Sequence, residues 1–130
     1  MNEVFELMAV EKLVPHENIN HDAANELHQK LLRDNAWTDP IVVSREGFVI
    51  LDGHHRFEIA KRMHLKFVPA YVVDYDSDSI ELRQWGTEDD MDKLAVLAAA
   101  RNKTMFPPKS TQHTFLKELQ RTNICLSVLR

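Results

Sequence analysis

The sequence predicts an α/β (α+β) fold: one domain over residues 1–130, with a small mixed β-sheet flanked by helices. Three observations lead to this prediction. Short apolar runs typical of strands alternate with segments of helical periodicity, and two of the runs form a hairpin. The length of 130 residues is that of one ordinary domain. A hydrophobic share of 44% and a charged share of 28% favour a folded globule over a disordered chain.

The first half of the chain predicts an alternation of strands and helices. Residues 4–13 alternate imperfectly between apolar and polar side chains, which indicates one or two strands. Apolar residues at helical spacing predict a helix over residues 21–35, ended by the Asp-Pro pair that follows. Two apolar runs, 41–44 and 48–51, predict a short hairpin, and the second leads directly into a helix that reaches about residue 63.

The second half predicts a similar mixture. Residues 67–73 and 80–85 are apolar runs that indicate strands. Thr87 is predicted to cap a helix. The apolar stripe predicted for that helix consists of Met91, Leu94, Ala95 and Ala98. Apolar side chains over residues 115–119 indicate a short helix after a Pro-Pro loop, and residues 124–129 are expected to form a closing strand.

Charge and cysteine content restrict the class of protein. A net charge of −4 argues against a protein held on nucleic acid mainly by bulk electrostatics. The one cysteine, Cys125, excludes an intramolecular disulfide and fits a reducing compartment. No apolar stretch has the length of a membrane span, and the acidic N-terminus lacks a signal-peptide core. We expect a cytoplasmic protein that does not bind membranes. Its oligomeric state stays open, a homo-oligomer included.

A strand-to-helix turn carries the candidate ligand-binding residues. Gly53 lies where the strand turns into the helix, and glycine there permits a tight turn and close approach of a ligand. Free backbone N–H groups and the helix dipole make such a helix start an anion site. His54, His55 and Arg56 add side-chain donors, and arginine holds phosphate oxygens in a bidentate manner. Cations at this end disfavour the helix itself, a conflict expected of functional residues. The turn therefore predicts a phosphate-binding site.

Two other interpretations of this turn stay open. Asp52 could merely cap the helix, with His54 and His55 as surface residues. The histidines could also bind a metal ion, but adjacent histidines point in different directions and no third ligand stands out at helical spacing. The metal ligands are therefore unknown.

The run Asp-Gly-His-His-Arg at residues 52–56, after a Val-Ile-Leu strand, resembles the signature of the ParB/sulfiredoxin-like superfamily. Within it, the form with two histidines resembles the free serine kinases, which phosphorylate L-serine to O-phospho-L-serine. The resemblance extends to the His-Glu pair at 16–17, to residues 40–43 and to the segment Pro-Pro-Lys-Ser-Thr-Gln-His at 107–113. It touches most of the chain and implies a ParB/sulfiredoxin-like single domain over residues 1–130.

The resemblance implies a phosphotransferase with ATP or ADP as donor and Mg²⁺ as cofactor. Glu17 is implied as the base or orienting carboxylate for the acceptor hydroxyl. Asp52 is implied beside the phosphates, as a second essential carboxylate or an indirect holder of magnesium. The implied nucleotide- and phosphate-binding residues are Gly53, His54, His55, Arg56 and Lys109. We expect Glu17, Asp52 and His113 to line one cleft.

The resemblance also implies a group of residues that binds the amino-acid substrate. This group consists of Trp85, Ser110, Thr111 and His113. Ser110 or Thr111 could also cap the final helix, which is compatible with binding, and Trp85 could equally be a core residue. Four other histidines receive no role beyond surface or helix-end positions: His16, His21, His28 and His64.

The chain departs from these families in two places. Sulfiredoxins carry a catalytic cysteine at the loop position of His54, so a sulfinic-acid reductase is not expected. The free serine kinases have much more chain between the region of Trp85 and the Pro-Pro-Lys segment, where this chain has only residues 86–106. A compact kinase and a kinase-derived binding domain both fit this shorter connection.

Three functions from different classes remain. The first is a kinase for free L-serine or a similar small hydroxyl substrate. The second is a non-catalytic nucleotide-binding regulatory module of the ParB-like class. The third is a DNA-associated or nuclease activity. Glu17, together with Thr111 and His113, favours the first over the second, whereas the acidic composition and the lack of a basic run or an expected helix-turn-helix disfavour the third.

Overall fold

A four-stranded mixed sheet is the centre of the computed structural model, which describes residues 3–130. Its strand order is β1 (Glu3–Ala9), β5 (Phe67–Val73), β3 (Ile41–Ser44) and β4 (Ile50–Asp52). β5 pairs with β1 antiparallel and with β3 parallel, while β3 and β4 form the predicted hairpin. The small mixed sheet predicted from the sequence is confirmed.

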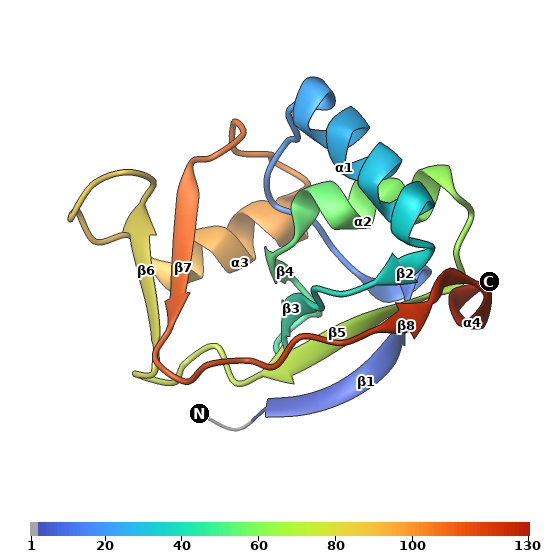
Figure 1. The fold of residues 1–130 in the computed structure, drawn as a ribbon. Coiled ribbons are helices and arrows are strands. Elements are labelled where there is room, and N and C mark those ends of the chain that lie inside the picture. Colours follow the sequence, from blue (N-terminus) through green and yellow to red (C-terminus); the bar gives the residue numbers. More distant parts are fainter. Residues whose placement is uncertain (1–2) are drawn as a thin grey trace.

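Two antiparallel strand pairs join distant parts of the chain. β2 (Ala36–Trp37) pairs with β8 (Ile124–Cys125), and β6 (Ile80–Gln84) pairs with β7 (Thr111–Phe115). Figure 1 shows the β6–β7 pair standing apart from the main sheet, and the segment after β7 running back along β5 toward β8. This return places residues 117–121 beside Asp52 and Arg56, in the strand–turn–helix that contains the predicted phosphate site.

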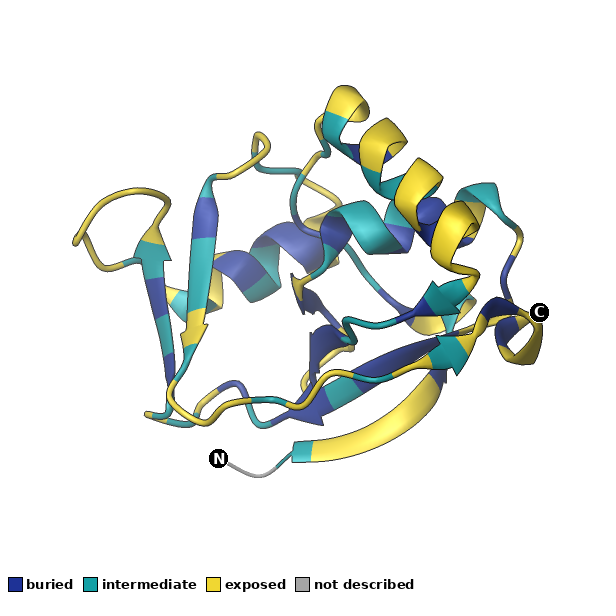
Figure 2. Cartoon of the chain, viewed as in Figure 1, coloured by how far each residue is buried: buried dark blue, intermediate teal, exposed yellow. Residues whose placement is uncertain are grey.

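Helices lie on both faces of the sheet. α1 (His21–Asp34) packs against α2 (His54–Arg62), and α3 (Lys93–Asn102) lies behind β6 and β7 (Figure 1). A short 3-10 turn (Val10–Lys12) and the final helix α4 (Leu126–Leu129) complete the chain. Helices on both faces explain why every residue of β3 is buried (Figure 2).

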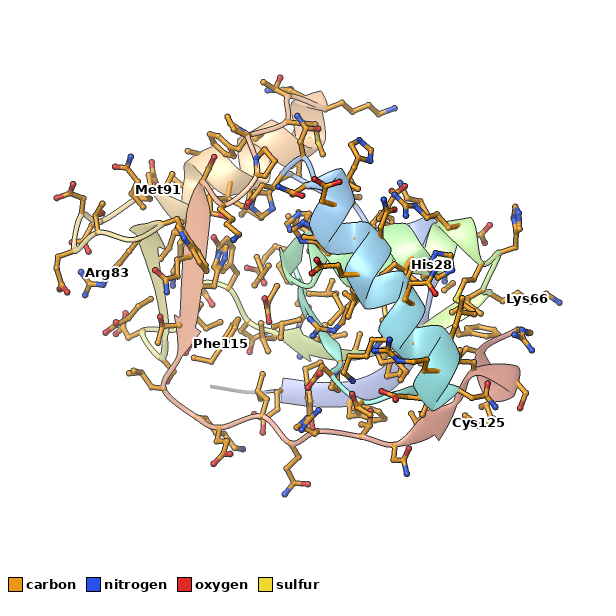
Figure 3. All side chains as sticks on the ribbon, turned by 45° about the horizontal axis from the view of Figure 1, so that its top comes forward. His28, Lys66, Arg83, Met91, Phe115 and Cys125 are labelled. Atoms are coloured by element: carbon orange, nitrogen blue, oxygen red, sulfur yellow. The ribbon has the colours of Figure 1, made fainter. Side chains whose placement is uncertain are left out.

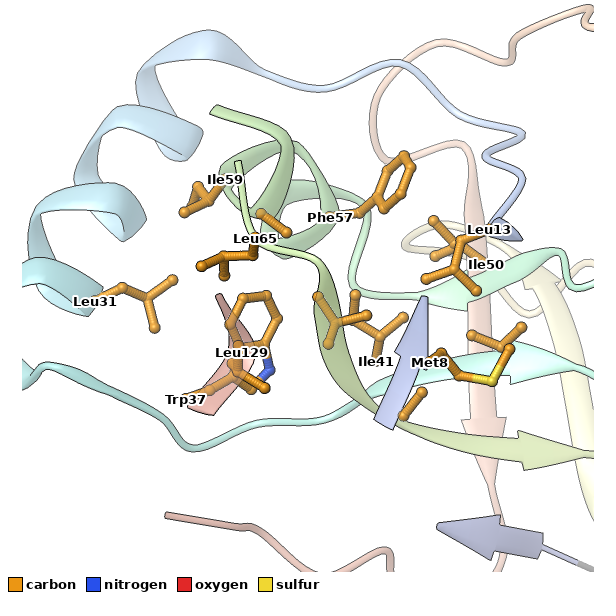
Figure 4. Close-up of a cluster of buried hydrophobic side chains, with 14 of the residues drawn as sticks. Met8, Leu13, Leu31, Trp37, Ile41, Ile50, Phe57, Ile59, Leu65 and Leu129 are labelled. Carbon is orange, nitrogen blue, oxygen red and sulfur yellow. The ribbon is translucent and has the colours of Figure 1, made fainter. Parts of the chain in front are cut away.

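The core divides into two clusters, one on each face of the sheet. Ile41 and Val43 face the first cluster, with Trp37 and Ile59 (Figure 4). Val42, the residue between them, faces the second, together with side chains of β6 and α3. Trp37 is fully buried, and its indole N–H donates to the carbonyl oxygen of Asp39 at 2.8 Å. No helix within residues 3–130 is both long and apolar enough to span a bilayer.

The helix predicted after Thr87 begins later than expected. Asp92 is its N-cap and accepts from the backbone N–H of Leu94, whereas the hydroxyl of Thr87 donates within a turn to Gln84. Met91 precedes the helix (Figure 3), and the side chain of Leu94 is 71% exposed, so the predicted apolar stripe is wrong. The buried face consists of Val96, Ala99 and Ala100.

Two predictions near the C-terminus are also wrong. Residues 115–119 are not a helix, because Thr111–Phe115 pairs with β6 as strand β7 and Leu116 is exposed. Residues 124–129 form strand only at Ile124–Cys125 and then turn into α4. Both errors have one cause: pairing with a distant strand decided the local conformation, and that partner is invisible to local periodicity.

Candidate active site

Gly53 adopts a backbone conformation that the turn into α2 requires. Its φ is +107°, and a Cβ built there would lie 3.0 Å from Cγ1 of Ile41. No side chain caps the N-terminus of α2. The turn therefore brings the backbone close to β3 and presents helix N–H groups without a side-chain acceptor, the arrangement that binds anions.

We expect Gly53→Ala to reduce the free energy of unfolding by about 1–3 kcal/mol, because alanine adds both a positive-φ strain and a contact with Ile41. Gly86→Ala is the matched control, since Gly86 has φ +75° but nothing within 4 Å of its built Cβ. Denaturant titration measures both variants. Equal losses of unfolding free energy in the two variants would show that the contact with Ile41 adds nothing to the destabilisation.

The two histidines of the turn hold the backbone of the segment that contains Glu17. Nε2 of His54 accepts from the N–H of His16 at 3.2 Å, and Nε2 of His55 accepts from the N–H of Asn20 at 3.0 Å. Burial lowers the pKa of both imidazoles, and for His54 the neighbouring histidines lower it further. In the neutral form each ring then carries its proton on Nδ1, the nitrogen left to donate.

Glu17 lies in this segment and its carboxylate is held by two donors from the far end of the chain. The backbone N–H of Ser110 donates to Oε1 at 3.2 Å, and the hydroxyl of Thr111 donates to Oε2 at 2.8 Å. The side chain is 11% exposed. Backbone hydrogen bonds between the segments around His16 and Phe106 keep the two regions side by side. Glu17 is therefore an oriented, nearly buried hydrogen-bond acceptor.

His16 is fully buried, so its predicted surface position is wrong. Its Nε2 lies 3.0 Å from the hydroxyl of Thr111, and its ring packs edge-on against His54 at a centroid distance of 4.6 Å. His113 lies next to it, with Nε2 2.7 Å from the hydroxyl of Tyr75. Burial lowers the pKa of His16 to about 4 and that of His113 to about 3. The three histidines thus form a neutral buried cluster beneath Glu17.

Asp52 and Arg56 line a cavity of about 300 Å³ on the other side of the turn. Desolvation raises the pKa of Asp52 although its side chain keeps contact with solvent, and Arg56 partly offsets this rise. Nη2 of Arg56 lies 3.3 Å from Asp39, which also binds Arg121 at 2.8 Å. The returning segment 115–121 forms the opposite wall. The volume is at the lower end of that of small-molecule sites.

Lys109 and Trp85 lie together at the surface. The Lys109 ammonium is 6.0 Å from the centroid of the Trp85 ring. The backbone N–H of Trp85 donates to the carbonyl oxygen of Ser110. Trp85 is 48% exposed, so the core alternative for this residue is wrong. Burial is the main cause of the lowered pKa of His55; the charge of Glu17 opposes the lowering and that of Lys109 adds to it.

The predicted site residues form two neighbouring groups. Glu17 and His54 line a small cavity of about 140 Å³, whereas Asp52 and Arg56 line the larger one. His113 lines neither of them, so the expectation of one cleft lined by Glu17, Asp52 and His113 is not met among residues 3–130. The same part of the chain holds no group of three side chains able to bind a metal ion.

Sequence reasoning missed four residues of this region, namely His16, Asp39, Tyr75 and Arg121. The only local signal was the adjacency of His16 to Glu17 and of Asp39 to Pro40. Their contacts join residues as far as 95 positions apart, which periodicity does not reveal.

Sequence comparison finds a ParB-like protein and L-serine kinases among the relatives, while no family model matches the chain. A ParB-like protein of Sulfolobus acidocaldarius is 37% identical over 84 residues, 65% of this chain and 42% of that protein. ATP-dependent L-serine kinases of Desulfurococcus mucosus and Staphylothermus marinus are 35% and 32% identical, each over 83 residues and 61% of this chain. The matches cover 32% and 33% of these kinases. The chain thus matches less than half the length of each relative.

Structure comparison shows the fold. A free serine kinase in complex with AMP superposes with a TM-score of 0.90 at 12% identity, over 97% of this chain and 93% of that one. SbnI from Staphylococcus aureus, truncated at its C-terminus, superposes with a TM-score of 0.80 at 13% identity, over 97% and 89%. Sequence and structure together confirm the predicted resemblance: the chain has the ParB/sulfiredoxin-like fold of the free serine kinases, and its sequence relatives include a ParB-like protein and L-serine kinases.

Proposed function

We propose that this chain is a kinase that transfers a phosphoryl group from ATP or ADP to free L-serine and gives O-phospho-L-serine. One observation carries the proposal: Glu17 is held by two donors beside the N-terminus of α2. A base for the acceptor hydroxyl and an anion site for the donor phosphates thus lie within one small region. The L-serine kinases among the relatives support this choice of reaction.

The donor phosphates would bind at the turn into α2. The uncapped helix start and the backbone at Gly53 supply N–H groups, while Arg56 and Lys109 supply positive charge. His54 and His55 would contribute Nδ1–H, because their Nε2 atoms accept backbone N–H groups. Mg²⁺ uses one or two carboxylates together with phosphate oxygens, and Asp52 lies where it would supply one.

The acceptor would approach from the side of Glu17. Glu17 takes the proton of the serine hydroxyl as that oxygen attacks the terminal phosphorus, and the bond from phosphorus to the leaving nucleotide breaks. Trp85 and Ser110 stand at the surface beside this point and would contact the amino acid. The resemblance also assigns Thr111 and His113 to the substrate, but both side chains already bind partners within the protein.

Phosphoryl transfer to a panel of free amino acids, with ATP and ADP tested separately and with Mg²⁺ present, tests the proposal. We expect transfer to L-serine and none to L-alanine, which lacks the hydroxyl. Binding of both nucleotides without transfer to any amino acid would instead indicate the non-catalytic regulatory module of the ParB-like class.

Arg56→Ala is expected to weaken nucleotide binding by about 1.5–3 kcal/mol, the scale of a charge-assisted hydrogen bond. Arg62→Ala is the matched control, since Arg62 lies at the other end of α2 and binds Asn25 and Glu58. Isothermal titration calorimetry measures both variants. Unchanged affinity in the Arg56 variant would remove Arg56 from the phosphate site.

A further inference from the structure

A chain of hydrogen bonds connects the buried interior to Glu17. Nε2 of His16 is 3.0 Å from Oγ1 of Thr111, which is 2.8 Å from Oε2 of Glu17. The direct distance from His16 Nε2 to Glu17 Oε2 is 3.9 Å, too long for a hydrogen bond. The threonine hydroxyl is therefore the link between the imidazole and the carboxylate.

The directions of these hydrogen bonds follow from the number of protons available. The Thr111 hydroxyl has one proton, and an ionised carboxylate only accepts, so that proton points to Glu17. The hydroxyl oxygen must then accept from His16, which requires a proton on Nε2. Burial keeps His16 neutral near pH 7, so Nδ1 carries no proton. The Thr111 contact thus favours the tautomer with the proton on Nε2, and this tautomer leaves Nδ1 as a buried nitrogen without a hydrogen-bond partner among residues 3–130.

This chain of hydrogen bonds from His16 through Thr111 to Glu17, called the relay below, is anchored at both of its ends. The backbone N–H of His16 donates to His54 at the start of α2, which ties the relay to the proposed phosphate site. At the other end, the backbone N–H of Ser110 donates to Oε1 of Glu17. Each carboxylate oxygen has one donor, so rotation of the carboxylate would break two hydrogen bonds.

We propose that His16 and Thr111 are positioning residues, which orient Glu17 through the relay His16 Nε2–H to Thr111 Oγ1–H to Glu17 Oε2. This rests on the proposed function for its catalytic consequence. Thr111 acts on the reaction through Glu17 and not through a contact with serine. The relay moves no proton during transfer; it determines which lone pairs of Glu17 face the acceptor hydroxyl.

Kinetics of two Thr111 variants test the catalytic part. Thr111→Val keeps the shape but removes the hydroxyl, and we expect kcat to fall ~10- to 100-fold, with KM for serine and nucleotide within about twofold. Thr111→Ser restores the hydroxyl and should recover kcat to within roughly threefold of wild type. Thr114→Val, on the exposed side of β7, is the matched control. A raised KM for serine with unchanged kcat would show that Thr111 binds the substrate, and would overturn the proposal.

Nitrogen-15 NMR of the wild-type imidazoles tests the relay without any need for activity. We expect His16 to be protonated on Nε2 and unprotonated on Nδ1, with chemical shifts that change in Thr111→Val and not in Thr114→Val. This result supports the relay even if no amino acid is phosphorylated, in which case only the proposed function fails. A proton on Nδ1 of His16, or shifts insensitive to Thr111→Val, would overturn the relay.

Discussion

Replacing Glu17 by glutamine is expected to lower the rate of serine phosphorylation by about two orders of magnitude or more, which is within the range of general-base contributions. Glutamine has nearly the same shape but cannot take the hydroxyl proton. Nucleotide affinity should change far less than turnover, because the phosphate contacts are assigned to Arg56 and the N–H groups of the turn, while Glu17 is assigned to the acceptor hydroxyl. Steady-state kinetics and calorimetry on the same preparation measure both quantities.

The same variant is expected to reverse the buried relay. The amide oxygen of the new side chain accepts from Ser110, so its NH₂ group faces the Thr111 hydroxyl. That hydroxyl then points its proton to His16, which must move its own proton from Nε2 to Nδ1. Glu11→Gln, an exposed carboxylate in the 3-10 turn, is the control for both measurements. Turnover near the wild-type rate in the Glu17 variant would remove Glu17 as the base.

The parts of the fold that local sequence determines were predictable. The turn at Gly53 follows a buried strand and opens a helix, and each of these features is visible in a few adjacent residues. Residues 115–119 show the opposite case. Their apolar side chains allowed a helix, but β7 exists because its neighbour is β6, 27 or more positions earlier along the chain. Sheet partners are non-local, and one sequence does not reveal them.

The candidate site divides in the same way. Arg56 and Gly53 were found because the motif is contiguous, and Glu17 was assigned through resemblance alone. A single histidine beside a proline carries no sign of burial, so the sequence does not reveal that His16 lies in the interior. Its partner Thr111 lies 95 positions away, and only the fold brings the two together. Asp39, which joins Arg56 to Arg121, escaped detection for the same reason.

Acidification from pH 7 to 5 is expected to destabilise the folded protein by several kcal/mol. His16, His54 and His113 are buried and neutral, and burial holds their folded-state pKa values well below the ordinary value of 6.5. In the unfolded chain these histidines gain protons as the pH falls below 6.5, whereas in the folded chain they do not. The stability that these neutral histidines contribute is therefore fully present above pH 6.5. It is lost as the pH falls toward their folded-state pKa values, which are about 4 for His16 and about 3 for His113.

The size of this loss follows from proton linkage. At pH 5 each buried histidine contributes about 2 kcal/mol, so the three together remove on the order of 6 kcal/mol. That is a large part of the free energy of unfolding of a small domain, which is typically about 5–15 kcal/mol. Asp39 acts below this window, because its neighbouring arginines lower its pKa despite partial burial. Desolvation raises the pKa of Asp52, and the protonation of that one carboxyl group opposes the loss. Between pH 7 and 5 the buried histidines should therefore dominate the slope.

Urea unfolding at closely spaced pH values measures the loss, and its slope gives the number of protons taken up on unfolding. We expect the three buried histidines to account for nearly three protons near pH 5, with a further share from His55, whose pKa burial also lowers. His64→Gln, at an exposed position after α2, is the matched control for the substitution itself. His113→Gln should reduce the uptake by about one proton, because one buried titratable ring is gone. A flat stability curve between pH 7 and 5 would mean that the cluster beneath Glu17 is open to protons in the folded protein, and the relay that orients Glu17 would then lack its neutral histidine.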